Sequence, residues 1–180
     1  MENIEKSTKK LELVNQWIAN CDTKSSFILT FYGVVLTIIF TSNIGGELIN
    51  SFSFTKAKDI NCENFKNFII LLISIAFFVT SIITFYQIYL TLKGRIDRNV
   101  YHQSGLNINS NIFFGSIASK NFIDFENETN SEDMPKYLND LNSQIFINSK
   151  IVDQKFKHYN NSLMWMFISL GIFILFVVIK

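Results

Sequence analysis

The chain has few of the residues that form covalent cross-links or metal sites. Its 180 residues include two cysteines and two histidines. Cys21 and Cys62 lie at opposite ends of a long apolar stretch, so they cannot meet in a disulfide within one chain. His102 and His158 are far apart and have no neighbouring ligands at metal-site spacing. We expect the cysteines to be structural or incidental, and we expect no metal and no resident cofactor.

Patterns typical of enzymes and of nucleic-acid-binding proteins are also missing. No Ser/His/Asp set and no Gly-rich phosphate loop is present, so we expect no enzymatic activity. The formal net charge is only +1, and there is no basic tract of the kind that binds nucleic acid.

Charge is absent from three long stretches, at 25–46, 67–92 and 159–179. As a helix, the stretch 67–92 would be about 39 Å long, whereas the hydrocarbon core of a bilayer is about 30 Å thick. A soluble chain of this length could not enclose so apolar a helix on all sides. The sequence therefore predicts an integral membrane protein with three spans.

The expected fold class is an all-α integral membrane protein. We expect a cytosolic or interfacial N-terminal helix over 1–25 and a transmembrane helical hairpin over 26–92, with an external loop at 43–66. A small cytosolic helical region for sensing and coupling covers 93–160, and a third transmembrane helix covers 161–180. Lysine and arginine flank the spans mainly on the side of the N-terminus and of 93–160, which places both in the cytosol.

The N-terminal segment has an apolar stripe at helical spacing, formed by Leu11, Val14, Ile18 and Cys21. The stripe is narrow, which favours a helix packed on the cytosolic part of the protein over one lying at the membrane interface. Asp22 and Lys24 follow where the first span begins. The sequence favours a helix break there, with a cap and a snorkelling lysine. The alternative is a buried ion pair in which Asp22 fixes the entering helix.

Small and hydroxylated residues share one face of each of the first two spans. On the first span these are Ser26, Thr30, Gly33, Thr37 and Thr41, and on the second they are Thr80, Thr84, Gln87 and Thr91. Such stripes let transmembrane helices approach closely, so helix packing is favoured over a weakly polar pore lining in an oligomer. The third span has only Ser169 and Gly171, and we expect it to face lipid more.

A single long helix is expected from about Met134 into the third span. Pro135 suits a first helical turn, and acidic residues precede it. A helical stripe continues from Leu138 to Leu163 without glycine or proline. This predicts one rod of roughly 45 residues, about 68 Å long, half in the cytosol and half in lipid. A rod of this kind could carry a cytosolic rearrangement into the bilayer.

Short motifs occur in a fixed order around these spans. They are Trp17-Ile18, Asp22-x-Lys24-Ser-Ser, Asn111-Ile-Phe-Phe-Gly-x-Ile117, Gln144-Ile-x-x-x-Ser-Lys-Ile151 and Lys155-Phe156. In this order the chain resembles, over nearly its whole length, the transmembrane effectors (PycTM) of Pycsar, the pyrimidine cyclase system for antiphage resistance. The resemblance implies a bacterial inner-membrane protein that responds to cyclic CMP or cyclic UMP from a partner cyclase. It also implies that the protein impairs the membrane of an infected cell and stops its growth.

A bound nucleotide would need positive or amide donors for its phosphate and an aromatic ring for its base. The candidates are Arg95, Arg98, Tyr101, Phe113, Phe114, Gly115, Ser116, Gln144 and Lys150. For some of them a structural role is the stronger interpretation. Adjacent phenylalanines commonly anchor a small core against a long helix, and Arg95 and Arg98 are ordinary membrane-flanking charges.

Two functions remain open at this point. The leading hypothesis is a ligand-gated, membrane-disrupting antiphage effector that acts as a homo-oligomer. The alternative is a membrane anchor or scaffold that recruits a partner of a bacterial conflict system without pore activity. Nucleotide-dependent leakage would distinguish the first from the second.

Overall fold

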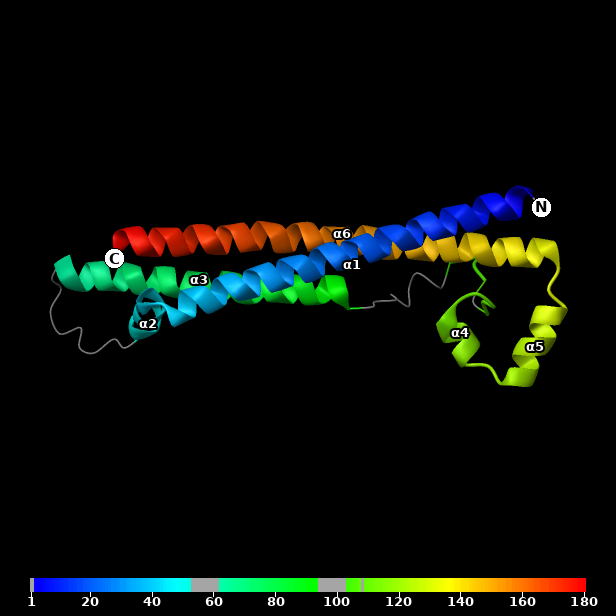
Figure 1. Cartoon of the computed structure of the whole chain (residues 1–180), viewed down its shortest axis with the longest axis horizontal. Helices are drawn as coiled ribbons and strands as arrows, with labels where there is room; N and C mark the ends of the chain where they lie inside the picture. Colours follow the sequence, from blue (N-terminus) through cyan, green and yellow to red (C-terminus); the bar gives the residue numbers. More distant parts are fainter. Residues whose placement is uncertain (1, 53–61, 94–102, 108) are drawn as a thin grey trace. The chain divides into compact units, whose positions relative to one another are not determined.

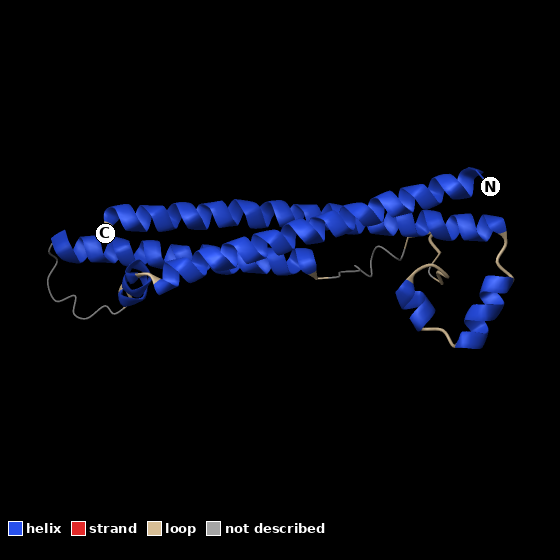
Figure 2. Cartoon of the chain, viewed as in Figure 1, coloured by secondary structure: helices blue, strands red, loops and turns tan. Residues whose placement is uncertain are grey.

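In a computed structural model, the described residues are 2–52, 62–93, 103–107 and 109–180, and all their regular structure is α-helical (Figures 1 and 2). The helices are α1 (Glu2–Thr41), α2 (Asn43–Asn50), α3 (Cys62–Leu92), α4 (Phe114–Ala118), α5 (Phe122–Asn130) and α6 (Met134–Ile179). The expected all-α fold class is therefore confirmed. Of these helices, α1, α3 and α6 are long and apolar enough to cross a membrane, as the uncharged stretches predict.

The chain divides into two compact units. We call the first the head unit, which comprises Met1–Asp22 and Gly94–Phe156. The second is the membrane unit, which comprises Thr23–Lys93 and Lys157–Lys180. Helices α1 and α6 contribute to both units. The expected boundaries at residues 25, 92 and 160 are defined by the bilayer, and they stay predictions.

The expected helix break near Asp22 is wrong, because α1 is one helix of 40 residues. The structure instead fits the alternative interpretation, an ion pair in which Asp22 fixes the helix. The Asp22 carboxylate accepts a hydrogen bond from Lys155 Nζ at 2.5 Å, and the Lys155 side chain is only 8% exposed. A carboxylate that has a partner on a neighbouring helix does not need a break and a cap to satisfy it.

In the head unit, the first part of α1 packs along α6. Ser7 donates a hydrogen bond to the Asn142 side chain at 3.0 Å, and Asn148 donates one to the Asn15 side chain at 2.8 Å. Trp17 also meets the ring of another aromatic residue, Phe156, edge to face at 6.1 Å. These contacts show that the N-terminal part of α1 packs on α6, and the stripe residue Cys21 is fully buried.

Helix α6 is continuous over its 46 residues, as its uninterrupted stripe predicts. It begins at Met134, where the Asp133 carboxylate accepts a hydrogen bond from the backbone N–H of Lys136 at 2.9 Å. Pro135 lies in the first turn, where its missing N–H costs no helical hydrogen bond. How α6 divides between the cytosol and lipid stays a prediction.

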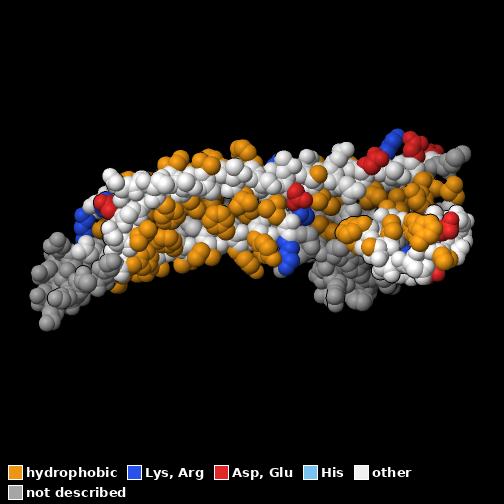
Figure 3. Space-filling model, turned by 60° about the horizontal axis from the view of Figure 1, so that its bottom comes forward, with side chains coloured by type: hydrophobic (Ala, Val, Ile, Leu, Met, Phe, Trp, Pro, Cys, Tyr) orange, Lys and Arg blue, Asp and Glu red, His pale blue; other side chains and the backbone are white. Residues whose placement is uncertain are grey.

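The membrane unit has two apolar clusters inside its helices and many apolar side chains outside. The first cluster centres on Ile28, Tyr32, Ile88 and Met166, and the second on Ile39, Leu48, Phe77 and Phe176. Large apolar side chains also cover outward surfaces of the molecule (Figure 3). Phe27, Ile82 and Val178, for example, are 73%, 67% and 76% exposed. Such surfaces suit contact with lipid chains.

A short helix lies where the sequence predicts a loop. Helix α2 occupies 43–50, and the Ser42 hydroxyl caps it by accepting a hydrogen bond from the Gly45 N–H at 3.3 Å. The turn into α2 brings two backbone segments close together. A Cβ atom at Gly45 would lie 2.4 Å from the Ile39 carbonyl oxygen and 2.7 Å from Phe40 Cα.

This contact predicts opposite results for two adjacent glycines. Replacing Gly45 with alanine should destabilise the membrane unit by about 1–3 kcal/mol, because backbone atoms must move to admit the methyl group. Gly46→Ala is the matched control, because a Cβ there meets nothing within 4 Å, and it should be neutral or stabilising by up to about 1 kcal/mol. Thermal unfolding in detergent, followed by circular dichroism, measures both. Equal unfolding temperatures for the two variants would contradict the packing described.

Candidate functional site

The segment before α4 is attached to α6 by backbone hydrogen bonds. The N–H of Asn111 donates to Asp140 Oδ2 at 2.8 Å, and the N–H of Asn107 donates to Ser143 Oγ at 3.0 Å. Ser110 caps the following turn, because its hydroxyl accepts hydrogen bonds from the N–H groups of Ile112 and Phe113. Gly105 has φ +93°, which fits the turn that its Gly/Asn/Ser-rich surroundings predict. This segment and α6 form the most buried polar region of the head unit.

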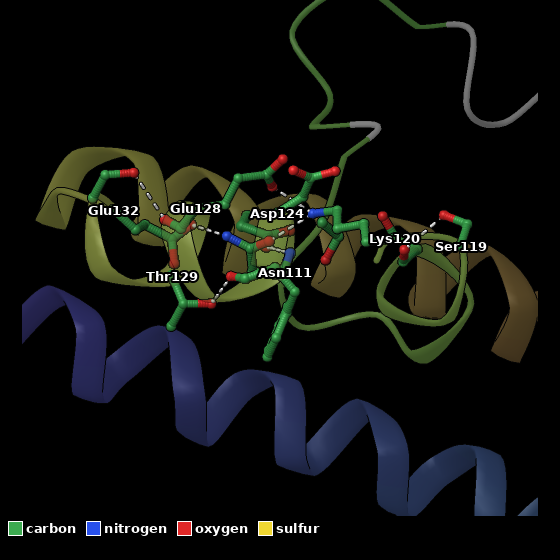
Figure 4. A network of polar contacts seen from close by, with 12 residues as sticks. Asn111, Ser119, Lys120, Asp124, Glu128, Thr129 and Glu132 are labelled. Carbon is green, nitrogen blue, oxygen red and sulfur yellow. Dashed lines mark hydrogen bonds and ion pairs between the residues drawn. The ribbon is translucent and has the colours of Figure 1, made fainter. Parts of the chain in front are cut away.

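A network centred on Lys120, in the connection between α4 and α5, joins α5 to the segment before α4 (Figure 4). Lys120 Nζ donates to Glu128 Oε2 at 2.6 Å and to Asn111 Oδ1 at 2.7 Å. The Asn111 side-chain amide in turn donates to Glu132 at 3.4 Å. Neither α4 nor α5 has a buried residue, so these polar contacts rather than a core of their own fix the two helices.

The hydrogen bond from Lys120 lowers the pKa of the Glu128 carboxyl, and its effect is larger than that of burial, which raises the pKa. The positive charges of Lys120 and Lys136 lower the pKa further. A lowered pKa in the folded state means that the pair stabilises the fold above the normal pKa of a glutamate. That stabilisation is lost as the pH falls through the lowered value.

The described candidate residues around α4 lie in different surroundings. The Phe113 and Phe114 rings lie 4.7 Å apart, but Phe114 is 75% exposed. The interpretation that both anchor a core is therefore wrong for Phe114. Gly115 lies under the Phe113 ring, where a Cβ would come within 2.6 Å of a ring carbon. The Ser116 carbonyl accepts a hydrogen bond from the Ser119 hydroxyl, which is a local α4 contact.

The two described candidates on α6 differ in exposure. Gln144 is buried on α6, at 5% exposure, one turn after Asp140. Lys150 is exposed, with its ammonium group 5.5 Å from the centroid of the Phe146 ring. Arg95, Arg98 and Tyr101 lie outside the described residues. Among the described residues, no group of three or more His, Cys, Asp or Glu side chains could hold a metal ion.

Sequence reasoning missed Asp140, which is fully buried. A signal for it exists, because Asp140, Ser143 and Gln144 recur at spacings of three and four along α6 and so share one face. A row of polar residues beside the apolar stripe of a long helix is a candidate for a polar contact or a ligand.

The membrane unit contains a buried hydroxyl cluster that links three helices. The Tyr32 hydroxyl of α1 donates to Ser81 Oγ of α3 at 2.8 Å. Ser169 Oγ of α6 lies 2.8 Å from the Tyr32 hydroxyl and 3.0 Å from Ser81 Oγ. Ser169 is an exception to the expectation that the third span faces lipid more, because that side chain is fully buried.

The two small-residue stripes lie in different surroundings. On α3, Thr80, Thr84 and Thr91 are buried, as the helix-packing interpretation of that stripe predicts, and the choice between packing and a pore lining stays a prediction. Gln87 lies beside them and its side-chain oxygen is 2.8 Å from His158 Nδ1 of α6.

On α1, by contrast, Thr30 and Thr37 are exposed, and each hydroxyl donates to a backbone carbonyl one turn earlier in the same helix. Gly33 between them has open space where a Cβ would lie. Packing within the described part of the chain therefore does not explain the α1 stripe.

Three apolar helices of membrane-spanning length, and a second unit held by polar contacts, define a multispan helical membrane protein. The profile of the Pycsar effector protein domain, PycTM, matches residues 6–180. Over 175 residues, the chain is 35% identical to the Pycsar effector protein GmPycTM of Gulbenkiania mobilis, an alignment that covers 95% of this chain and 89% of the relative. No solved structure matches the chain significantly. The chain belongs to the Pycsar effector family of transmembrane antiphage defence effectors.

Proposed function

We propose that this protein impairs the bacterial inner membrane when it receives cyclic CMP or cyclic UMP from a partner cyclase, and so arrests growth or aborts infection. The observation that carries the proposal is the family match, which extends over 6–180 and so includes both compact units. The relative that aligns along 95% of this chain is itself named as a Pycsar effector. The cyclic nucleotide is the only small molecule that this function requires.

The head unit is the proposed receiver of the nucleotide, on the cytosolic side together with the N-terminus. The excess of lysine and arginine beside the spans on this side supports that orientation. The head unit also supplies the polar side chains that a nucleotide needs, whereas the described surface of the membrane unit is mainly apolar. A cytosolic receiver is required because a partner cyclase would release its product inside the cell.

The membrane-impairing state is proposed to be a homo-oligomer. The outward stripe of α1 supports this, because Thr30, Gly33 and Thr37 offer a small-sided surface that no neighbouring helix of the described chain covers. Small residues allow close contact between transmembrane helices of different copies. The corresponding α3 residues are already used for packing inside one copy. A leak would then arise between copies, along α1.

Dye-loaded proteoliposomes containing the full chain test this function. Addition of cyclic CMP or cyclic UMP is expected to raise dye release at least tenfold over the nucleotide-free rate, because binding shifts the chain toward the open assembly. Cyclic AMP and linear 5′-UMP are the controls, and both should leave release at background. Saturable binding of a cyclic pyrimidine nucleotide without any release would contradict membrane impairment.

A passive anchor or scaffold is the second candidate function. The observation that favours it is the exposure of Phe114, Phe122 and Ile123 on α4 and α5, at 75%, 73% and 67%. Exposed apolar side chains on a polar unit are typical of contact with a protein partner. Under this alternative, changing these three residues to serine would remove partner recruitment in cells, while the membrane would stay intact with or without nucleotide.

A further inference from the structure

Asp140 has one carboxylate oxygen without a partner. The residue is fully buried on α6, and its Oδ2 accepts the Asn111 N–H at 2.8 Å. Its Oδ1 is also buried, and it has no hydrogen-bond partner among the described residues. A buried acceptor without a donor is costly, and a structure that keeps one generally has a use for it. Asp140 Oδ1 can accept a hydrogen bond from a donor group of a bound molecule.

A second polar residue lies one helical turn away. Gln144 is 5% exposed, and its side-chain amide carries both a donor and an acceptor. Residues four apart on a helix lie about 40° apart around its axis and about 6 Å apart along it. Ser143 between them is already used, because its hydroxyl accepts the Asn107 N–H. Asp140 and Gln144 thus present an acceptor and a donor–acceptor amide side by side.

We propose that Asp140 and Gln144 bind the hydrogen-bonding edge of a pyrimidine base, a site that rests on the cyclic nucleotide function proposed above. Uracil offers the N3–H between two carbonyl oxygens, and cytosine offers its 4-amino group beside the N3 acceptor. In either case the carboxylate of Asp140 accepts the donor of the base, and the amide of Gln144 donates to a neighbouring acceptor. A carboxylate repels phosphate, so this pair holds the base and not the cyclic phosphate.

The same contact gives the nucleotide a means to change the head unit. Because Oδ1 is buried, a base reaches it only after a local opening at this face of α6. The segment that contacts this face is attached by the Asn107 and Asn111 N–H bonds. A base that competes for Asp140 therefore favours a head unit in which this segment is displaced.

Asp140→Asn in the full-length protein tests the site, because asparagine keeps the acceptor for the Asn111 N–H and replaces the unpartnered carboxylate oxygen with an NH₂ donor. Binding of radiolabelled cyclic CMP and cyclic UMP to the detergent-purified protein should weaken at least tenfold. The unfolding temperature of the nucleotide-free variant should change little, because the buried charge is gone but a buried NH₂ group without an acceptor takes its place. A residue that only caps the Asn111 segment would leave the affinity unchanged, and that result would overturn the proposal.

Gln144→Ala should also weaken binding at least fivefold, whereas Gln154→Ala, an exposed glutamine on the same helix, should not.

N3-methyl cyclic UMP lacks the donor of uracil, so it should bind the unchanged protein as weakly as cyclic UMP binds Asp140→Asn. The opposite pattern would be a normal affinity for N3-methyl cyclic UMP and a reduced affinity for 2′-deoxy cyclic UMP that requires Asp140. That pattern would show that Asp140 contacts the ribose, and it would overturn the base assignment. If the unchanged protein binds neither cyclic nucleotide, the proposed function fails. If it binds one and all variants bind equally, only this site fails.

Discussion

Asp22→Ala is expected to destabilise the protein by about 3 kcal/mol, because it removes the carboxylate beside a buried ammonium group. Lys155 Nζ lies 2.5 Å from Asp22 Oδ1, and the Lys155 side chain is 8% exposed while that of Asp22 is 38% exposed. The two residues thus differ in how well water could replace the lost partner. Lys155→Met leaves a carboxylate that water already reaches, so it should cost about 1 kcal/mol or less.

The double variant Asp22→Ala, Lys155→Met separates the ion pair from other effects. With neither charge present, its stability should return to within about 1 kcal/mol of Lys155→Met alone, since the ammonium group that faces Asp22 is then absent as well. Lys9→Met is the matched control, because the Lys9–Glu5 pair has a similarly short distance, 2.6 Å, but both side chains are at least two-thirds exposed, at 71% and 68%. This control should cost less than about 0.5 kcal/mol.

Reversible unfolding in detergent at neutral pH measures all four variants, and dye release reports whether the pair matters for activity. Equal losses for Asp22→Ala and Lys155→Met, adding in the double variant, would show that the two residues act independently. The proposed coupling through the long helices would then have no support from this contact.

The positions and lengths of the long helices were predictable because they depend on local sequence. Long uncharged stretches predict spans by length alone, and an unbroken apolar stripe from Leu138 to Leu163 predicts that α6 is continuous. The break expected at Asp22 did not occur, because the partner that removes the need for it is Lys155, 133 residues further along the chain. A local pattern does not contain that contact.

The candidate sites show the same limit more strongly. Periodicity identifies which residues share a face of a helix, but it does not determine which face meets a neighbour. This is why the α1 and α3 stripes look alike in sequence although one is exposed and the other buried. Ser169 is one serine in an apolar span, and its significance depends on Tyr32 and Ser81, which are 137 and 88 residues away. Asp140 was missed because its burial arises from packing of the whole head unit.

Gly33→Leu is expected to reduce nucleotide-dependent dye release to background while one copy of the protein still folds. A Cβ at Gly33 meets nothing within 4 Å, so a side chain can leave the helix there without a backbone clash. Leucine is also a better helix former than glycine, by up to about 1 kcal/mol. In the proposed oligomer, however, the close approach of α1 to another copy would be blocked, because such contacts depend on small residues.

Two matched variants distinguish this effect from a loss of folding or a general change in lipid contact. Thr84→Leu, in the buried α3 stripe, should destabilise the single chain by about 1–3 kcal/mol through overpacking. Val34→Leu, an exposed α1 residue beside the stripe, should change neither stability nor release. Chemical cross-linking in the proteoliposomes measures the assembly directly, and Gly33→Leu should lose the cross-linked species that the unchanged protein forms with nucleotide. If Gly33→Leu releases dye normally, the α1 stripe faces lipid in the active state and the leak must form elsewhere.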